Sequence, residues 1–100
     1  MPSAESELNY AYKGTTFLPA EIVSEWQEKA EWVDISYNAF DNFRAFSKFN
    51  RLHHLNMDHN LISHDTVFTP IPGLLSLSLA NNKVSKYPFP QNHYAIILDS

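Results

Sequence analysis

Apolar residues recur along the chain with a fixed 22-residue period. Within each unit, two apolar residues stand two positions apart, as Val33 and Ile35 do. Because side chains alternate between the two faces of a strand, this spacing predicts a short strand with one buried side. Four apolar columns share the period: Ala30, Leu52 and Leu74; Val33, Leu55 and Leu77; Ile35, Met57 and Leu79; and Phe40, Ile62 and Val84.

An asparagine follows each of these strands, at Asn38, Asn60 and Asn82. Its amide can bond backbone groups that a turning chain leaves unpaired, and stacked units would give each asparagine the same task. Apolar columns and asparagines together match the leucine-rich repeat pattern L-x-x-L-x-L-x-x-N-x-L. The sequence therefore predicts an α/β fold, a right-handed solenoid with a parallel sheet on its concave face and irregular or 3₁₀ structure on its convex face.

The repeat pattern also predicts how a single domain of residues 1–100 is divided. Leu8 and Tyr10 point inward in a degenerate first unit, and Ile96 falls in the opening column of a fourth. That last unit either lies against the third strand as a rudimentary cap or marks a fragment or short isoform. The expected segments are 1–7 flexible, 8–29 first unit and capping helix, repeats at 30–51, 52–73 and 74–95, and 96–100 an incomplete repeat or cap.

A helix is predicted over residues 19–29, where Ile22, Val23 and Trp26 recur at helical spacing. Pro19 is expected as its first residue, with Thr15 or Thr16 as a cap. The helix is expected to cover the apolar end of the first strand, as terminal repeats must. The alternative is a partner-binding helix anchored by Trp26.

Three segments must return along the convex side. In the first, residues 41–51, the three-residue spacing of Phe43, Phe46 and Phe49 predicts a short helix or 3₁₀ turns that face the core. The second, residues 63–73, and the third, residues 85–94, each contain two prolines. Because proline breaks a helix, neither is expected to be helical.

Charge and composition narrow the functional classes. The chain contains seven Lys and Arg residues and eleven Asp and Glu residues, and charges of one sign do not cluster along it. This distribution argues against direct nucleic-acid binding, which needs clustered positive charge. The chain has no cysteine, and this favours a reducing, intracellular setting. Its start lacks the features of a signal peptide, and no apolar stretch is long enough for a membrane span. We expect a cytoplasmic protein, with the nucleus left open, and an incomplete C-terminal edge that promotes self-association.

The predicted strands place a polar patch on the concave face. Neighbouring strands lie about 4.8 Å apart, so equivalent residues form contiguous columns. Trp32 is the single large aromatic among them, and we expect it to anchor another protein, with the residues of the following turns at the rim. The candidate partner-binding residues are Trp32, Asp34, Tyr37, His54, Asn56, Asp58, His59, Ser76 and Ser78.

Catalytic and metal chemistry are weaker alternatives on the same face. Ser36, Asp58 and His54 can be drawn as a hydrolytic group, but an open surface excludes no water and offers no oxyanion donor. His54 and Asp58 could share a metal, yet the other histidines do not form a compact ligand set. We therefore expect no enzyme activity, no cofactor and no metal, and keep a hydrolase or metal site as the remote alternative.

The segment Val33–Asn38 resembles the L-D-L-S-x-N element of small intracellular leucine-rich repeat proteins with 22-residue units. Residues 30–86 are most similar to the melanocyte differentiation-associated type, on the M-D-x-N turn at Met57 and the P-x-P-x-L approach at Pro70. The resemblance implies a non-enzymatic adaptor in pigment-cell or lysosome-related organelle biogenesis. The alternative is a structural segment of a longer scaffold, like the U2-type spliceosomal repeat protein.

Overall fold

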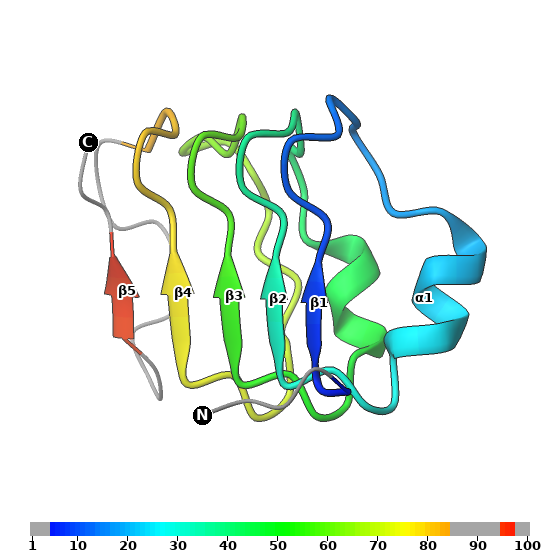
Figure 1. Cartoon of the computed structure of the whole chain (residues 1–100). Coiled ribbons are helices and arrows are strands. Elements are labelled where there is room, and N and C mark those ends of the chain that lie inside the picture. Colours follow the sequence, from blue (N-terminus) through cyan, green and yellow to red (C-terminus); the bar gives the residue numbers. More distant parts are fainter. Residues whose placement is uncertain (1–4, 85–94, 98–100) are drawn as a thin grey trace.

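The fold is built on one open parallel sheet of five strands, in the order β1-β2-β3-β4-β5 (Figure 1). The computed structural model describes residues 5–84 and, for the backbone, 95–97. A short 3₁₀ helix, η1, and a short α-helix, α1, complete the α/β architecture. In chain order the elements are β1 (Glu7–Asn9), α1 (Ala20–Trp26), β2 (Trp32–Asp34), η1 (Arg44–Lys48), β3 (His54–Asn56), β4 (Ser76–Ser78) and β5 (Ala95–Ile97).

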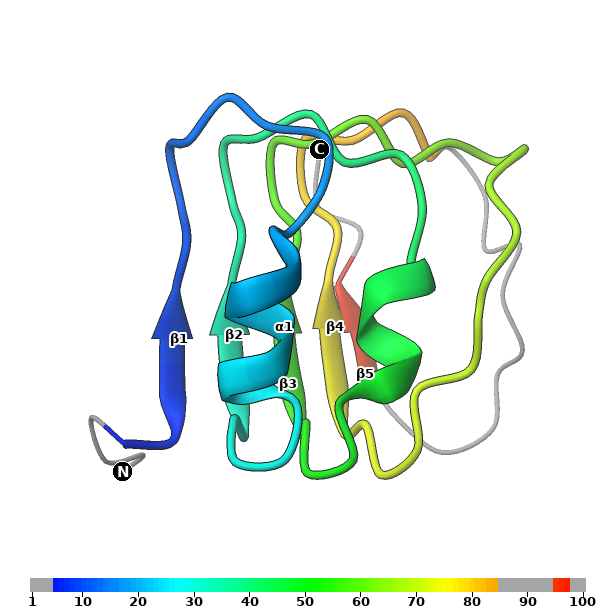
Figure 2. The same cartoon turned by 90° about the vertical axis from the view of Figure 1, so that its right-hand side faces the viewer.

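Both helices lie on one side of the sheet (Figure 2). The central residue of each strand from β1 to β4 points to that side and is buried, as Val33 and Leu55 are at 2% exposure. Its two neighbours in the strand face the other way. No helix in the described part of the chain covers this second face (Figure 1), which we call the open face.

The 22-residue spacing of the three central strands is confirmed by their register. Val33 pairs with Leu55 and Leu55 with Leu77, all in parallel orientation. The first strand departs from this period, because Leu8 pairs with Val33 and so lies three positions too early in the chain. Leu8 is buried, as expected for a degenerate first unit.

The expected flexible segment of residues 1–7 needs correction at its end. Glu7 belongs to β1, and the carbonyl oxygen of Ser6 accepts hydrogen bonds from the N–H groups of Glu31 and Trp32 at 2.8 and 3.1 Å. These bonds hold the start of β1 against β2. Residues 1–4 lie outside the described part.

The last strand is also placed differently from the prediction. Ile96 pairs with Leu77, three positions short of a full period, so it stands in the second apolar column and not in the opening one. The expected boundary between 95 and 96 falls inside β5. Leu77 and Leu79 are 0% and 2% exposed, so both side chains are covered at this end of the sheet. The third return, residues 85–94, lies outside the described residues.

The helix α1 is shorter than predicted, seven residues in place of residues 19–29. Pro19 precedes it with extended backbone, and no side chain caps it. Thr15 instead bonds the backbone of Phe17 through its hydroxyl. Ile22, Val23 and Trp26 pack against the core, which agrees with a covering helix. No helix within the described residues has the length and apolar character needed to cross a membrane.

The two described return segments match their predictions. In the first, η1 is a 3₁₀ helix, and Phe43, Phe46 and Phe49 are fully buried. The second, residues 63–73, contains no helix. Phe68 from this segment packs edge-on against Phe43, with ring centroids 5.1 Å apart. The phenylalanines of these two returns therefore belong to the core or pack against it.

Candidate functional site

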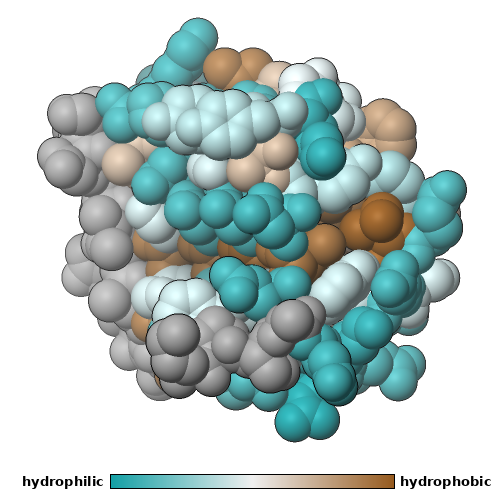
Figure 3. Space-filling model, viewed as in Figure 1, coloured by the Kyte–Doolittle hydropathy of each residue, from teal (hydrophilic) through white to brown (hydrophobic). Residues whose placement is uncertain are grey.

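Two rows of side chains cross the open face at right angles to the strands. They come from the residues on either side of each buried central position, and the strand register brings equivalent residues together. Figure 3 shows an apolar stripe between two hydrophilic bands on this face. We call the depression between the rows the sheet groove. The first row is Glu7, Trp32, His54 and Ser76, and the second is Asn9, Asp34, Asn56 and Ser78.

The first row is a continuous chain of contacts from Trp32 to Ser76. The rings of Trp32 and His54 stack with centroids 4.0 Å apart, and His54 Nδ1 lies 2.7 Å from Ser76 Oγ. Trp32 nevertheless remains 40% exposed. Desolvation, with a smaller contribution from the charge of His53, lowers the pKa of His54. The imidazole is therefore neutral near pH 7, and the row carries no fixed positive charge.

The second row is fixed by bonds to the chain just beyond each strand. Asp34 Oδ1 accepts from the Ser36 N–H, and Asn56 Oδ1 accepts from the Asp58 N–H, both at 2.9 Å. Asp58 in turn accepts hydrogen bonds from the Ser78 hydroxyl and the Ala80 N–H. These polar groups are held in place before any partner arrives.

The rows enclose a shallow hollow of about 270 Å³. Six of the nine predicted partner-binding residues line it, and Tyr37, Asp58 and His59 do not. The lining residues are Glu7, Trp32, Val33, Asp34, His54, Leu55, Asn56, Ser76 and Ser78.

Tyr37 and His59 belong to a separate arrangement at the turns. Tyr12 stacks on Tyr37 with ring centroids 4.3 Å apart, and Tyr37 stacks on His59 at 4.1 Å. The amide of Asn81 follows, 3.1 Å from His59 Nε2. All four residues adopt left-handed backbone conformations, with φ between 57° and 60°. We call this set the turn stack. Eight of the nine predicted partner-binding residues therefore divide between two surfaces, and Asp58, which bonds Ser78 and Ala80, belongs to neither.

The three asparagines of the repeat pattern bond the backbone. Asn60 is 4% exposed, and its Oδ1 accepts from the Phe40 N–H at 2.8 Å, while its Nδ2 donates to the Ile35 carbonyl at 2.9 Å. Asn38 bonds backbone groups of the first unit in the same way. Asn82 Oδ1 accepts from Ile62 N–H, and its Nδ2 donates to the Met57 carbonyl, both at 2.8 Å. Each amide thus ties one turn to the preceding unit.

The possible hydrolytic group does not come together. Ser36 is buried, His54 bonds Ser76, and the carboxylate of Asp58 bonds Ser78. Within the described residues, no group of three or more His, Cys, Asp or Glu side chains is close enough to hold a metal ion. The geometry therefore gives no support to the hydrolase or metal alternative.

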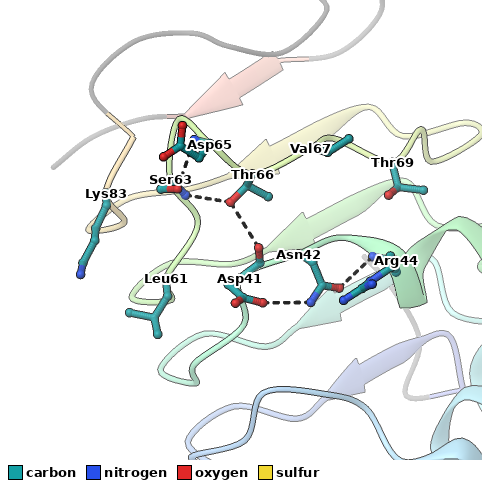
Figure 4. Close-up of a pocket in the computed structure, with 10 residues that line it drawn as sticks. All are labelled: Asp41, Asn42, Arg44, Leu61, Ser63, Asp65, Thr66, Val67, Thr69 and Lys83. Atoms are coloured by element: carbon teal, nitrogen blue, oxygen red, sulfur yellow. Dashed lines mark hydrogen bonds between the residues drawn. The ribbon is translucent and has the colours of Figure 1, made fainter.

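A larger hollow of about 690 Å³ lies between the two described returns, near the turns (Figure 4). Its polar groups are used locally. Thr66 Oγ1 donates to the Asp41 carbonyl and accepts from the Ser63 N–H, and Asn42 bonds both Asp41 and Arg44. Its charges are mixed, and Val67 is its most exposed apolar residue, at 81%. We assign this hollow to the packing of the returns.

Four polar or aromatic residues of these surfaces were not among the predicted site residues: Glu7, Asn9, Tyr12 and Asn81. Glu7 occupies the column of Trp32, and Tyr12 occupies the column of Tyr37, both in the degenerate first unit. The signal was present in the sequence. Aligning Lys13 with Asn38 aligns Glu7 with Trp32 and Tyr12 with Tyr37. The first unit matches the repeat pattern too poorly for its polar positions to be recognised as site residues.

Family models, curated proteins and solved structures were each compared with the chain, and none of them matches it. Function is therefore inferred from the geometry of the chain's own residues.

Proposed function

We propose that the chain is a non-enzymatic leucine-rich repeat module that binds another protein through its open face. Two features support the repeat assignment. Strands β2, β3 and β4 recur with one register, and the three asparagines bond the backbone in equivalent ways. The repeated residues therefore also occupy equivalent places in the sheet and make equivalent hydrogen bonds.

The exposure of Trp32 is the observation that carries the binding proposal. Leaving 40% of a tryptophan exposed to water is unfavourable, yet this one is held flat against His54 in the middle of a polar surface. Aromatic residues surrounded by polar groups are the usual energetic centres of protein interfaces. The groove around Trp32 runs across four neighbouring strands, which suits a chain segment of another protein better than an enclosed small molecule.

Trp32→Ala tests this proposal. The full chain is used to capture partners, and each captured protein is then titrated against the wild type and the variant. We expect the dissociation constant to rise by about 30-fold or more, equivalent to about 2 kcal/mol, because the central contact of the interface is lost. Circular dichroism spectra and thermal unfolding of the same samples report whether the fold survives.

Phe17→Ala is the matched control, since Phe17 is also an exposed aromatic, at 62%, but lies outside the sheet groove. It should leave binding unchanged. Equal losses for both variants, or normal binding by folded Trp32→Ala protein, would contradict the assignment of the open face.

A further inference from the structure

We propose that the partner segment is basic and that one of its arginines stacks on Trp32, with its guanidinium between Glu7 and Asp34. This inference rests on the proposed function and adds the chemistry of the partner. Charge complementarity, ring geometry and the dimensions of the groove each support it.

The sheet groove is acidic. Glu7 and Asp34 line it, no lysine or arginine of the described residues does, and Asp58 lies just beyond it. The basic residues of the described chain are used elsewhere. Lys29 pairs with Glu25 and lies over Trp26, Arg51 pairs with Glu31, and Lys13 lies over Tyr10. Arg44 and Lys83 line the hollow between the returns, and Lys48 lies beside α1. The groove therefore has uncompensated negative charge that a cationic partner would neutralise.

Among the described residues, only His54 stacks on the ring of Trp32. His54 covers the face on the β3 side, at 4.0 Å between centroids. The other face lies toward β1, where the neighbour in the row is Glu7. A guanidinium group is planar, stacks on aromatic rings and pairs with carboxylates in a fixed geometry. An arginine on this face would meet the ring and a carboxylate together.

Asp34 supplies the second carboxylate. Its Oδ1 accepts from the Ser36 N–H at 2.9 Å, which fixes the group, and its second oxygen has no hydrogen-bond partner among the described residues. That oxygen is free to accept from a ligand. Because the carboxylate is already oriented, little side-chain entropy is lost when a guanidinium binds.

The length of the groove sets the length of the segment. Four strands at about 4.8 Å spacing give a groove of about 14 Å, which an extended chain spans with four to five residues. The polar residues of both rows suit the backbone of such a segment, which has to keep its own amide groups hydrogen-bonded. Nucleic acid is a poor occupant, since its phosphates would face Glu7 and Asp34.

Binding of short labelled peptides to the full chain tests the inference directly. The probe is an eight-residue glycine-serine peptide with one central arginine, followed by fluorescence anisotropy at low salt. Three further peptides replace the arginine by citrulline, by lysine or by glutamate. Citrulline keeps the planar shape and removes the charge. We expect the arginine peptide to bind at least 10-fold more tightly than the citrulline peptide and several-fold more tightly than the lysine peptide, with no binding of the glutamate peptide.

The double variant Glu7→Gln with Asp34→Asn removes both carboxylates and keeps the acceptor for Ser36. It should weaken binding of the arginine peptide about 10-fold and reduce its preference over citrulline, since only the stacking on Trp32 remains. The control, Asp41→Asn with Asp65→Asn, removes the same charge from the hollow between the returns and should bind like the wild type. Equal binding of the arginine and citrulline peptides, or equal losses in both double variants, overturns the inference.

The same variants separate this inference from the function on which it depends. If a captured protein partner loses affinity with Trp32→Ala but keeps it with the Glu7→Gln and Asp34→Asn double variant, the open face binds protein and the basic partner is wrong. If Trp32→Ala leaves the captured partner bound while the arginine peptide still prefers the groove, the protein-binding role of the face fails instead. A stronger response to a single-stranded oligonucleotide than to the arginine peptide would contradict both.

Discussion

Side-chain amides complete the backbone hydrogen bonding at the turns that follow β2, β3 and β4. Asn60 is the clearest case, because it is buried and bonds backbone groups on both sides of the turn in the preceding unit. A buried backbone group without a partner costs free energy comparable to a lost hydrogen bond. The stability of the turn therefore depends on one polar side chain.

Asn60→Ala should lower the free energy of unfolding by about 1–3 kcal/mol, because the Phe40 N–H would lose its partner and the Ile35 carbonyl would keep only its bond from Asn38 Nδ2. Urea unfolding followed by circular dichroism measures the loss. Asn50→Ala is the control, since Asn50 is exposed and should change stability by less than about 0.5 kcal/mol. Asn56 is unsuitable as a control, because its side chain accepts from the Asp58 N–H. Equal urea midpoints for the variants at 60 and 50 would contradict the role of the amide.

His54 should make stability depend on pH. Its pKa is lowered in the folded protein, mainly by desolvation, so the unfolded chain binds the proton more readily. The contribution of His54 is therefore fully present above its ordinary pKa of 6.5 and is lost as the pH falls through the lower, folded value. Because His54 binds at most one proton, it can change the free energy of unfolding by no more than about 1.4 kcal/mol per pH unit.

Unfolding measured from pH 7.5 to 5 tests this pH dependence. His54→Gln should flatten the decline in stability below pH 6.5, even if its stability at pH 7.5 is lower because the stacking on Trp32 is lost. His64→Gln, at an exposed position, should keep the wild-type slope. A slope unchanged by His54→Gln would show that other groups are responsible.

Strands of only three residues depend on their neighbours. Each of β2, β3 and β4 buries one central side chain and pairs with a strand on either side, as expected of a stack in which units touch only their neighbours. The terminal strands therefore matter as much as the central ones. β5 has this role for β4, where Ile96 pairs with Leu77.

A chain that ends at residue 84 should be destabilised by about 2 kcal/mol or more, because removal of β5 exposes the edge of β4 and part of the surface around Leu77. Such an edge can pair with another chain, so we also expect concentration-dependent association. Thermal unfolding and sedimentation equilibrium measure the two effects. A chain that ends at residue 97 keeps β5 and is the control. A monomeric short chain with the wild-type melting temperature would contradict the covering role of β5.

The central elements were predictable from the sequence, and the terminal ones only in part. Val33, Leu55 and Leu77 share one environment, so one rule describes all three. Phe43, Phe46 and Phe49 were predictable for a similar reason, since a three-residue period matches a 3₁₀ helix. The position of β5 was not predictable, because it departs from the period by three positions. The end of α1 was missed because the turn at residues 27–29 has no strong helix-breaking residue.

At the scale of the whole molecule, burial separates a covered face that stabilises the fold from an open polar face, for which we propose a role in recognition. The apolar columns, which the sequence displays directly, point to the covered side. The rows of the open face were also predictable, because side chains alternate between the two faces of a strand. Which polar residues make contact was not, because the stacking of Trp32 on His54 and the bond between His54 and Ser76 depend on side-chain conformation. Glu7 was missed because it lies outside the regular repeats.

The unequal spacing of the strands has a consequence for how the chain can change in length. Compared with the step from Leu55 to Leu77, the step from Leu8 to Val33 is three positions longer and the step from Leu77 to Ile96 is three shorter, yet all the strands lie in one register. The strands set the geometry, and the connecting segments absorb the difference. An insertion inside a strand would turn its buried residue outward, whereas one in a return would leave the sheet intact. We therefore expect insertions and deletions to be tolerated in each return and not in each strand. The returns are the best sites at which to insert added peptide sequences.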